Sequence, residues 1–155
     1  MTDKAFFPLF MDLTDKDILF VGGGSIAERR VMVLQPFADG ITVVAPEAEG
    51  GIIALAEEGE VNWITREFDK DDLEGRDIVF AATDDKELNA EIAAKCREKG
   101  IAVNVSSDRE LCDFYFPGIV TQGETVIGVS ASGQDHKKAR RVRERIQEIL
   151  TEEGI

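Results

Sequence analysis

The sequence predicts an α/β protein, with a Rossmann-like, doubly wound parallel sheet followed by a small β-hairpin and a C-terminal helix. Short apolar runs alternate with helical segments as far as residue 105. A glycine-rich turn joins the first apolar run to the first helical segment. Two further apolar runs then follow each other without a helix between them, which is typical of an antiparallel hairpin. We therefore divide the chain into a sheet domain over residues 1–110 and a hairpin with its helix over residues 111–155.

The composition is that of a globular domain. Of the 155 residues, 43% are hydrophobic and 32% are charged. No apolar run reaches the roughly 18–20 residues of a membrane span, and the first residues lack a signal-peptide pattern. We therefore expect a cytoplasmic protein with no membrane partner. The formal net charge of −13 argues against nucleic-acid binding through a basic surface.

The cysteine and histidine content indicates neither a disulfide framework nor a metal site. The two cysteines, Cys96 and Cys112, form no CxxC pair, and His136 is the single histidine. We expect Cys112 to be a buried thiol. We expect His136 to be a surface residue at the start of a helix.

The first strand and its turn form the most informative motif. Residues 18–21 are a continuous apolar run, and three glycines follow them. Gly22 permits the turn out of the strand, and Gly24 lets the backbone approach a pyrophosphate. Ala27 takes the third small-residue position of the dinucleotide-binding fingerprint. The N–H groups and the dipole of the following helix favour a phosphate there. The alternative is a glycine turn in an α/β domain that binds another ligand.

The remaining elements of the sheet domain follow from hydrophobic periodicity. A helix is expected from Ser25 to about Ala38, with Pro36 close to its end. Gly100 ends the last helix of this domain. The apolar segment over residues 5–13 is expected along the edge of the domain. The other predicted elements are strands over residues 41–45, 61–64, 77–81 and 101–105, and helices over residues 48–58 and 87–99.

The C-terminal part combines the hairpin with an amphipathic helix. The hairpin strands are expected over residues 114–120 and 126–130, joined around residues 122–124. Asp135 is a plausible N-cap of the last helix. The apolar stripe of this helix consists of Ala139, Val142, Ile146, Ile149 and Leu150. Its basic residues are Lys137, Lys138, Arg140, Arg141, Arg143 and Arg145. They form either a solvated face or a surface that binds a polyanion through charge-assisted hydrogen bonds.

Polar residues follow the predicted parallel strands where these strands end, and ligands of open α/β sheets bind outside such ends. Glu47 lies 23 residues after Gly24, close to the ~20-residue offset of the acidic residue that binds a ribose. The alternative role for each of these polar residues is to cap a helix or turn, as Thr83 or Asp84 would at the start of the next helix. The residues expected near a nicotinamide are Ala82, Thr83, Asp84, Asn104, Ser106, Ser107 and Asp108.

Seven motifs together resemble the precorrin-2 dehydrogenase family, which includes the dehydrogenase/ferrochelatase module of siroheme synthases. They lie at residues 7–13 (FPLFMDL), 21–30 (VGGGSIAERR), 42–47 (TVVAPE), 81–85 (AATDD), 104–105 (NV), 111–117 (LCDFYFP) and 129–133 (VSASG). The resemblance covers about residues 6–150. The joint set is far more specific than the glycine turn alone.

The resemblance implies an oxidoreductase of siroheme and porphyrin biosynthesis, which oxidises the tetrapyrrole precorrin-2 to sirohydrochlorin with NAD. It also implies a homodimer built through the hairpin and the C-terminal helix. The alternatives are a bifunctional enzyme that also inserts iron, and a non-catalytic protein that binds a dinucleotide or a tetrapyrrole. By position, the implied NAD contacts are Gly22, Gly24, Ser25, Ile26, Pro46, Glu47, Ala82, Thr83 and Asp84.

The implied substrate is a polycarboxylate, which gives the basic helix face a function in an acidic protein. We expect Lys137, Arg140 and Arg141 to bind its carboxylates, with Asn104 as a further substrate contact. The charge of Glu47 favours NAD over NADP, because it repels a 2′-phosphate.

The chain departs from the family pattern at two positions. Ser107 occupies the place of the aspartate that family members use as acid/base, and Asp108 comes next. A serine cannot replace a carboxylate as a base without an activating partner. Either Asp108 takes over the role, or the activity is altered. In addition, Gly118 stands where a serine is common.

Overall fold

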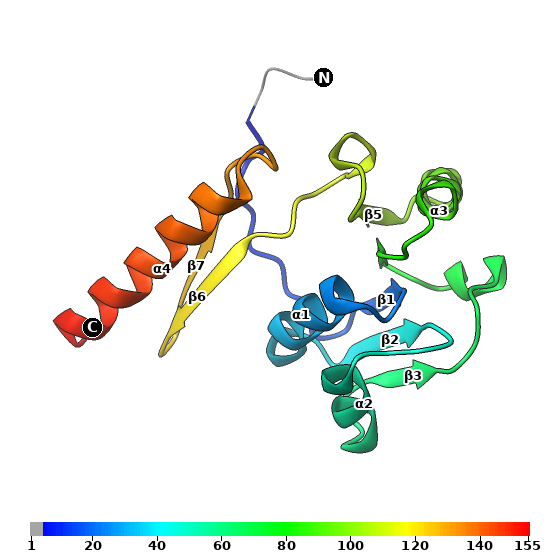
Figure 1. Cartoon of the computed structure of the whole chain (residues 1–155), viewed down its shortest axis with the longest axis horizontal. Coiled ribbons are helices and arrows are strands. Elements are labelled where there is room, and N and C mark those ends of the chain that lie inside the picture. Colours follow the sequence, from blue (N-terminus) through cyan, green and yellow to red (C-terminus); the bar gives the residue numbers. More distant parts are fainter. Residues whose placement is uncertain (1–4) are drawn as a thin grey trace. The chain divides into compact units, whose positions relative to one another are not determined.

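The computed structural model describes residues 5–155 and consists of two compact units (Figure 1). The sheet unit is Phe10–Phe114. The hairpin–helix unit combines Tyr115–Ile155 with the N-terminal segment up to Leu9. The division thus falls shortly after the boundary expected from the sequence at residue 110.

The N-terminal segment differs from the expectation for residues 5–13. Residues 5–9 belong to the hairpin–helix unit rather than to the edge of the sheet domain. The ring of Phe6 stacks on that of Tyr115 with the centroids 4.0 Å apart. This contact joins segments that are far apart in the sequence, and periodicity carries no information about it.

The sheet unit confirms the predicted doubly wound architecture. Its strands are β1 (Asp17–Val21), β2 (Gly40–Val44), β3 (Asn62–Ile64), β4 (Ile78–Ala81) and β5 (Ala102–Val105), all parallel in the order β3-β2-β1-β4-β5. The helices are α1 (Ser25–Leu34), α2 (Gly50–Glu57) and α3 (Lys86–Lys99). The central strands are continuous apolar runs because both of their faces are covered. Leu19 and Val79 pack with Ile92 of α3, and all three are fully buried.

The ends of the helices follow local chemistry. Helix α1 stops at Leu34, earlier than expected, and a short 3-10 turn, η1 (Gln35–Phe37), continues the chain. Pro36 lacks the N–H group that the helical hydrogen-bond ladder needs. Gly100 ends α3 as predicted, in the left-handed conformation with φ +69°.

The hairpin–helix unit contains β6 (Gly118–Gln122), its antiparallel partner β7 (Thr125–Val129), and α4 (His136–Glu153). The paired part of β6 begins later than the expected residue 114. The Phe114 carbonyl accepts a hydrogen bond from Asn104 in the sheet unit, and Pro117 has no N–H to donate. The Asp135 carboxylate accepts the Lys138 N–H at 2.8 Å, which confirms Asp135 as the N-cap.

Little of the hairpin–helix unit is buried. Among its described residues, only Val120 falls in the buried hydrophobic core. Helix α4 buries none of its residues, and Val142 and Ile149 of the predicted stripe are 42% and 40% exposed. Over residues 5–155, no helix combines the length and the apolar character that crossing a membrane requires.

Candidate functional site

The centre of the candidate site is the point where the strand order reverses, between β1 and β4. Gly22 follows β1 with φ +110°, and a Cβ atom there would lie 2.3 Å from the Ala82 carbonyl oxygen. The Gly22 N–H donates to Val44 O at 3.0 Å. The turn therefore contacts the backbone that follows β4, and only glycine fits this conformation and this contact.

The next two glycines have different surroundings. A Cβ at Gly23 would lie 2.4 Å from the Glu47 carbonyl oxygen, and the Glu49 N–H donates to Gly23 O at 2.8 Å. At Gly24, a Cβ would meet no described atom within 4 Å. Gly22 and Gly23 thus allow close packing of the loops, whereas Gly24 faces open space.

The beginning of α1 is suited to an anion. Gly24 is its N-cap, and within residues 5–155 no side chain caps it. The N–H groups of the first turn have no partner inside a helix, and they carry its positive dipole end. Ser25 and Ile26 are exposed, while Ala27 is fully buried and lets the helix pack closely on the sheet. The open space at Gly24 and this helix start fit the pyrophosphate of a dinucleotide.

The loop after β2 places an acidic residue beside the turn. Pro46 and Glu47 are exposed, and the Glu47 backbone lies against Gly23. Glu28, in the first turn of α1, has a role that no sequence motif indicates. Its carboxylate accepts the Gly51 N–H at 2.7 Å and thereby caps α2.

The loop after β4 is held by a buried asparagine. The Thr83 hydroxyl donates to Oδ1 of Asn89 at 2.6 Å, and the Thr83 N–H donates to the same oxygen at 3.2 Å. The cap of α3 is neither Thr83 nor Asp84 but Asp85, whose carboxylate accepts the Glu87 and Leu88 N–H groups. Three adjacent residues can each cap a helix, so the sequence alone did not distinguish them.

Asn104 lies inside the sheet unit, with 3% of its surface exposed. Its Oδ1 accepts a hydrogen bond from Nη1 of Arg30 at 2.7 Å, and its Nδ2 donates to Phe114 O at 2.8 Å. Burial lowers the pKa of the Arg30 guanidinium from its usual value. Both the oxygen and the nitrogen of the Asn104 side-chain amide are thus hydrogen-bonded within the protein.

The loop after β5 carries the two candidate catalytic residues on the surface. Ser107 and Asp108 are exposed. The Ser107 hydroxyl accepts a hydrogen bond from Nδ2 of Asn89 at 3.1 Å. The Asp108 carboxylate accepts the Glu110 N–H at 2.9 Å and caps the short turn η3 (Arg109–Leu111). One cap bond leaves this carboxylate with further acceptor positions.

The two thiols are poorly suited to nucleophilic chemistry. Cys96 is fully buried, and burial raises its pKa to about 11. Cys112 is half-buried rather than fully buried, and burial also raises its pKa. Its Sγ accepts the Val105 N–H at 3.1 Å. Both thiols stay protonated at neutral pH.

The expected substrate-binding cations lie on α4, in the hairpin–helix unit. Lys137, Arg140 and Arg141 are exposed. The Arg140 Nε donates to the Glu144 carboxylate at 2.8 Å, and this bond raises the pKa of Arg140. His136, the first residue of α4, is exposed as predicted.

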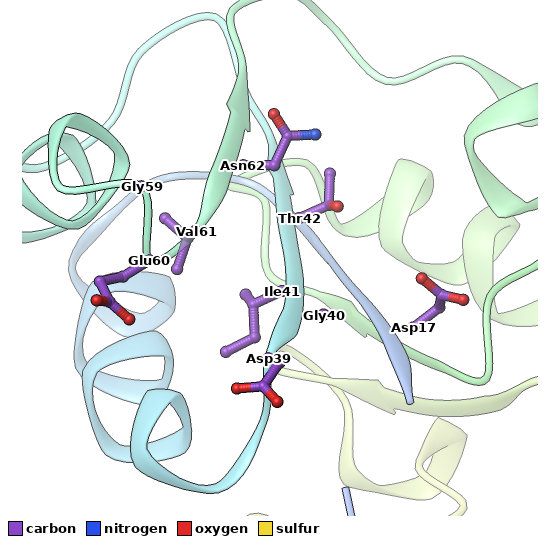
Figure 2. Close-up of a pocket in the computed structure, with 9 residues that line it drawn as sticks. All are labelled: Asp17, Asp39, Gly40, Ile41, Thr42, Gly59, Glu60, Val61 and Asn62. Atoms are coloured by element: carbon purple, nitrogen blue, oxygen red, sulfur yellow. The ribbon is translucent and has the colours of Figure 1, made fainter. Parts of the chain in front are cut away.

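A depression of about 370 Å³ lies at the opposite edge of the sheet, where β1, β2 and β3 begin (Figure 2). Its lining carries the carboxylates of Asp17, Asp39 and Glu60. These charges repel an anionic dinucleotide, so we place the site at the edge that carries the glycine turn. Among residues 5–155, no group of three histidine, cysteine or carboxylate side chains is arranged to hold a metal ion.

Comparisons with known proteins agree with this geometry. A family model described as putative NAD(P)-binding matches residues 9–118. The siroheme synthase of Methylococcus capsulatus is 39% identical over 145 residues, which cover 94% of this chain and 31% of the relative. The siroheme synthase of a Psychrobacter species is also 39% identical, over 93% of this chain and 30% of the relative. The chain therefore spans about a third of the length of these relatives.

A solved structure described as SirC, precorrin-2 dehydrogenase, has a similar fold. It matches with a TM-score of 0.79 at 24% identity, over 92% of this chain and 70% of that chain. It supports the predicted fold class.

Proposed function

The chain belongs to the family of putative NAD(P)-binding domains, and from this premise we propose that it is an oxidoreductase that oxidises precorrin-2 to sirohydrochlorin with NAD. The observation that carries the proposal is the glycine turn, which presents Gly24 to open space at a helix start that no side chain of residues 5–155 caps. The names of the siroheme synthases and of SirC, precorrin-2 dehydrogenase, support the choice of substrate.

Backbone and side chains of three loops bind the cofactor in this proposal. The N–H groups at Gly24, Ser25 and Ile26 hold the pyrophosphate. Pro46 and Glu47 hold the adenosine ribose, and the Glu47 carboxylate repels a 2′-phosphate, so NAD binds more tightly than NADP. Ala82, Thr83 and Asp84 line the nicotinamide half. When bound, NAD supplies the acceptor for a hydride.

Oxidation of the substrate also releases a proton, and Asp108 is our proposed acceptor. Its carboxylate is exposed and makes one cap bond to the Glu110 N–H. Ser107 has its oxygen bonded to Asn89 rather than to a base, and a serine hydroxyl needs an adjacent base to act. We therefore assign the proton to Asp108 and a contact role to Ser107.

The carboxylates of precorrin-2 bind the basic face of α4. Lys137, Arg140 and Arg141 supply exposed cations for charge-assisted hydrogen bonds. Both ends of the Asn104 amide are bonded within the protein. In this proposal Asn104 therefore orders the sheet unit around Phe114 rather than contacting the substrate.

A second copy of the chain completes the hairpin–helix unit in this proposal. Among the described residues of this unit, only Val120 is in the buried hydrophobic core, so the hairpin and its helix bury little apolar surface by themselves. The exposed apolar side chains of α4, Val142 and Ile149, are suited to cover the same face of a second copy. The protein is thus proposed to be a homodimer.

The test is an assay of the purified protein with precorrin-2 and NAD, followed by NADH absorbance. NADH formation supports the proposal, and tight NADH binding without turnover points instead to a binding protein. Metal-dependent loss of sirohydrochlorin would reveal an added iron-insertion activity. Asp108→Ala is expected to lower kcat by about 10²–10⁴-fold, the usual contribution of a general base. Undiminished turnover in this variant would remove Asp108 as the proton acceptor.

A further inference from the structure

Asn89 is a polar residue in an apolar position of α3. Its neighbours on the buried face of the helix are Ile92, Ala93 and Cys96, and all four have no exposed surface. A buried amide is costly unless its hydrogen bonds are made. The hydrogen bonds that Asn89 makes therefore indicate why an amide side chain occupies this buried position.

All four hydrogen-bonding positions of the Asn89 amide are used. Oδ1 accepts both the N–H and the hydroxyl of Thr83, at 3.2 and 2.6 Å. Nδ2 donates to the Thr83 carbonyl at 3.0 Å and to the Ser107 hydroxyl oxygen at 3.1 Å. An asparagine has two acceptor and two donor positions, and none is left over.

These bonds join two loops that are distant in the sequence. Thr83 belongs to the loop after β4 (residues 82–85), and Ser107 belongs to the loop after β5 (residues 106–108). β4 and β5 are adjacent parallel strands, so both loops leave the same edge of the sheet. Ser106 reinforces the junction by donating its N–H to Ala81 O at 3.0 Å.

We infer that Asn89 is a positioning residue, which fixes the loop after β4 to the loop after β5. The inference rests on the proposed function, because those loops line the nicotinamide half and carry Asp108. Asn89 has no exposed surface, and so it touches neither cofactor nor substrate. It sets the separation between the site of hydride transfer and the proton acceptor. A displacement of about 1 Å in such an arrangement can cost about 100-fold in rate.

The amide group is needed for this role. Leucine has a similar size and shape but no polar atoms. Aspartate, when ionised, supplies acceptors for Thr83 but no donor for the Thr83 carbonyl. Only an amide at this length offers the observed set of two acceptors and two donors.

The first test uses hydrogen–deuterium exchange in the protein without cofactor. Asn89→Ala is expected to raise the exchange rates of the backbone amides in both loops by about tenfold or more, because the shared anchor is lost. Cys96→Ala is the matched control, since it opens a cavity on the same buried face and leaves both loops protected. Faster exchange in residues 82–85 alone would overturn the inference.

Ser107→Ala provides a second variant, because Ser107 is exposed and its replacement does not threaten folding. It removes the bond between the loops and keeps the three bonds to Thr83. We expect about threefold faster exchange in residues 106–108, with the Thr83 amide still protected. Unchanged exchange in residues 106–108 would contradict the inference even if Asn89→Ala does not fold.

The second test is kinetic. Asn89→Ala is expected to lower kcat with precorrin-2 and NAD by about 10–100-fold and to leave KM for precorrin-2 within about threefold, because substrate binding is assigned to α4. Cys96→Ala should keep the wild-type kcat. Wild-type kcat in Asn89→Ala would overturn the inference. Absence of NADH formation by the wild-type protein would instead refute the proposed function, and the exchange rates would still decide whether Asn89 joins the loops.

Discussion

The sheet unit and the hairpin–helix unit differ in how they bury apolar side chains and in how they carry charge. The central strands of the sheet unit are almost completely buried, whereas only Val120 is in the buried core of the hairpin–helix unit among residues 5–9 and 115–155. Phe10–Phe114 contains 24 acidic and 11 basic residues, which accounts for the whole net charge of −13. Residues 115–155 contain six of each sign.

This difference separates two ways of obtaining a stable fold. The sheet unit buries its apolar side chains within itself. Its fold can therefore tolerate a large excess of negative charge on its surface. The hairpin–helix unit has little net charge to oppose association, and Val142 and Ile149 of its apolar stripe are exposed. In the proposed function, the self-contained sheet unit therefore binds the cofactor and the hairpin–helix unit forms the dimer.

The largest expected effect comes from disrupting the sheet unit at its turn. Gly22→Ala should lower the free energy of unfolding by about 3 kcal/mol or more, because a Cβ at φ +110° meets the Ala82 carbonyl. Gly24→Ala is the matched control and should cost under about 1 kcal/mol, while NADH binding weakens about tenfold. Urea unfolding and NADH titration measure the two effects. Equal stability losses would show that Gly22 and Gly24 do not have separate roles.

The next effect concerns assembly through α4. The double substitution Val142→Asp and Ile149→Asp should weaken dimerisation by about 100-fold or more, since it places charges in the apolar stripe. NADH affinity of the sheet unit should stay unchanged. Thr151→Asp adds a charge outside the stripe and serves as the control. Sedimentation over a range of concentrations measures the dimer constant, and an unchanged dimer would place the interface elsewhere.

A smaller effect is expected from the cations of the hairpin–helix unit. Arg140→Glu with Arg141→Glu should raise KM for precorrin-2 by about 10-fold or more, because attraction to the substrate carboxylates becomes repulsion. Arg145→Glu is the control, since it reverses a charge on the same helix at a residue outside the proposed substrate contacts. Steady-state kinetics at fixed ionic strength measure KM. An unchanged KM in the double variant would exclude this face from substrate binding.

The smallest effect concerns the acid sensitivity of the sheet unit. Both carboxylate oxygens of Asp72 accept hydrogen bonds from Arg66, at 2.7 and 2.9 Å, and these bonds lower the pKa of Asp72. A lowered folded pKa stabilises the fold above the ordinary carboxyl pKa of about 4, and this stability is lost as the pH falls below it. Asp72→Asn should therefore lower Tm by about 2–4 °C at neutral pH, and the difference should shrink in acid.

Asp71→Asn is the control for Asp72, because it removes the same charge from the neighbouring residue. Thermal unfolding between pH 3 and pH 7 follows both variants. A Tm difference that persists unchanged at pH 3 would show that the Asp72 carboxylate is not its source.

Most of the sheet unit could be predicted because the sequence signals that specify its strands and helix ends are local. Apolar runs predicted the parallel strands, and Gly100 and Asp135 predicted helix ends through the chemistry of single positions. The start of β6 was harder to predict, because Phe114 belongs to a buried hydrogen-bond network. The stack of Phe6 on Tyr115 could not be predicted, since nothing in either segment specifies the other.

The location of the candidate site could be predicted from the sequence, but its hydrogen-bond network could not. The end of each strand predicted which loops meet, and the structure confirms that Gly22 contacts the loop after β4. The inward direction of Asn104 and the bonds of Asn89 depend on side-chain orientation, which residue order does not specify. The roles of Ser107 and Asp108 in the reaction stay predictions.

The bond between Arg30 and Asn104 has a consequence for the order of folding. It joins residues 74 apart in the sequence, and Asn104 also holds Phe114, the last residue of the sheet unit. Such a long loop closes late, because its ends lose much conformational entropy when they meet. Phe114, where the chain leaves the sheet unit, is therefore held in place only after β5 has joined the sheet. During synthesis, the hairpin and α4 are made after every residue of this network, so the sheet unit can close without them.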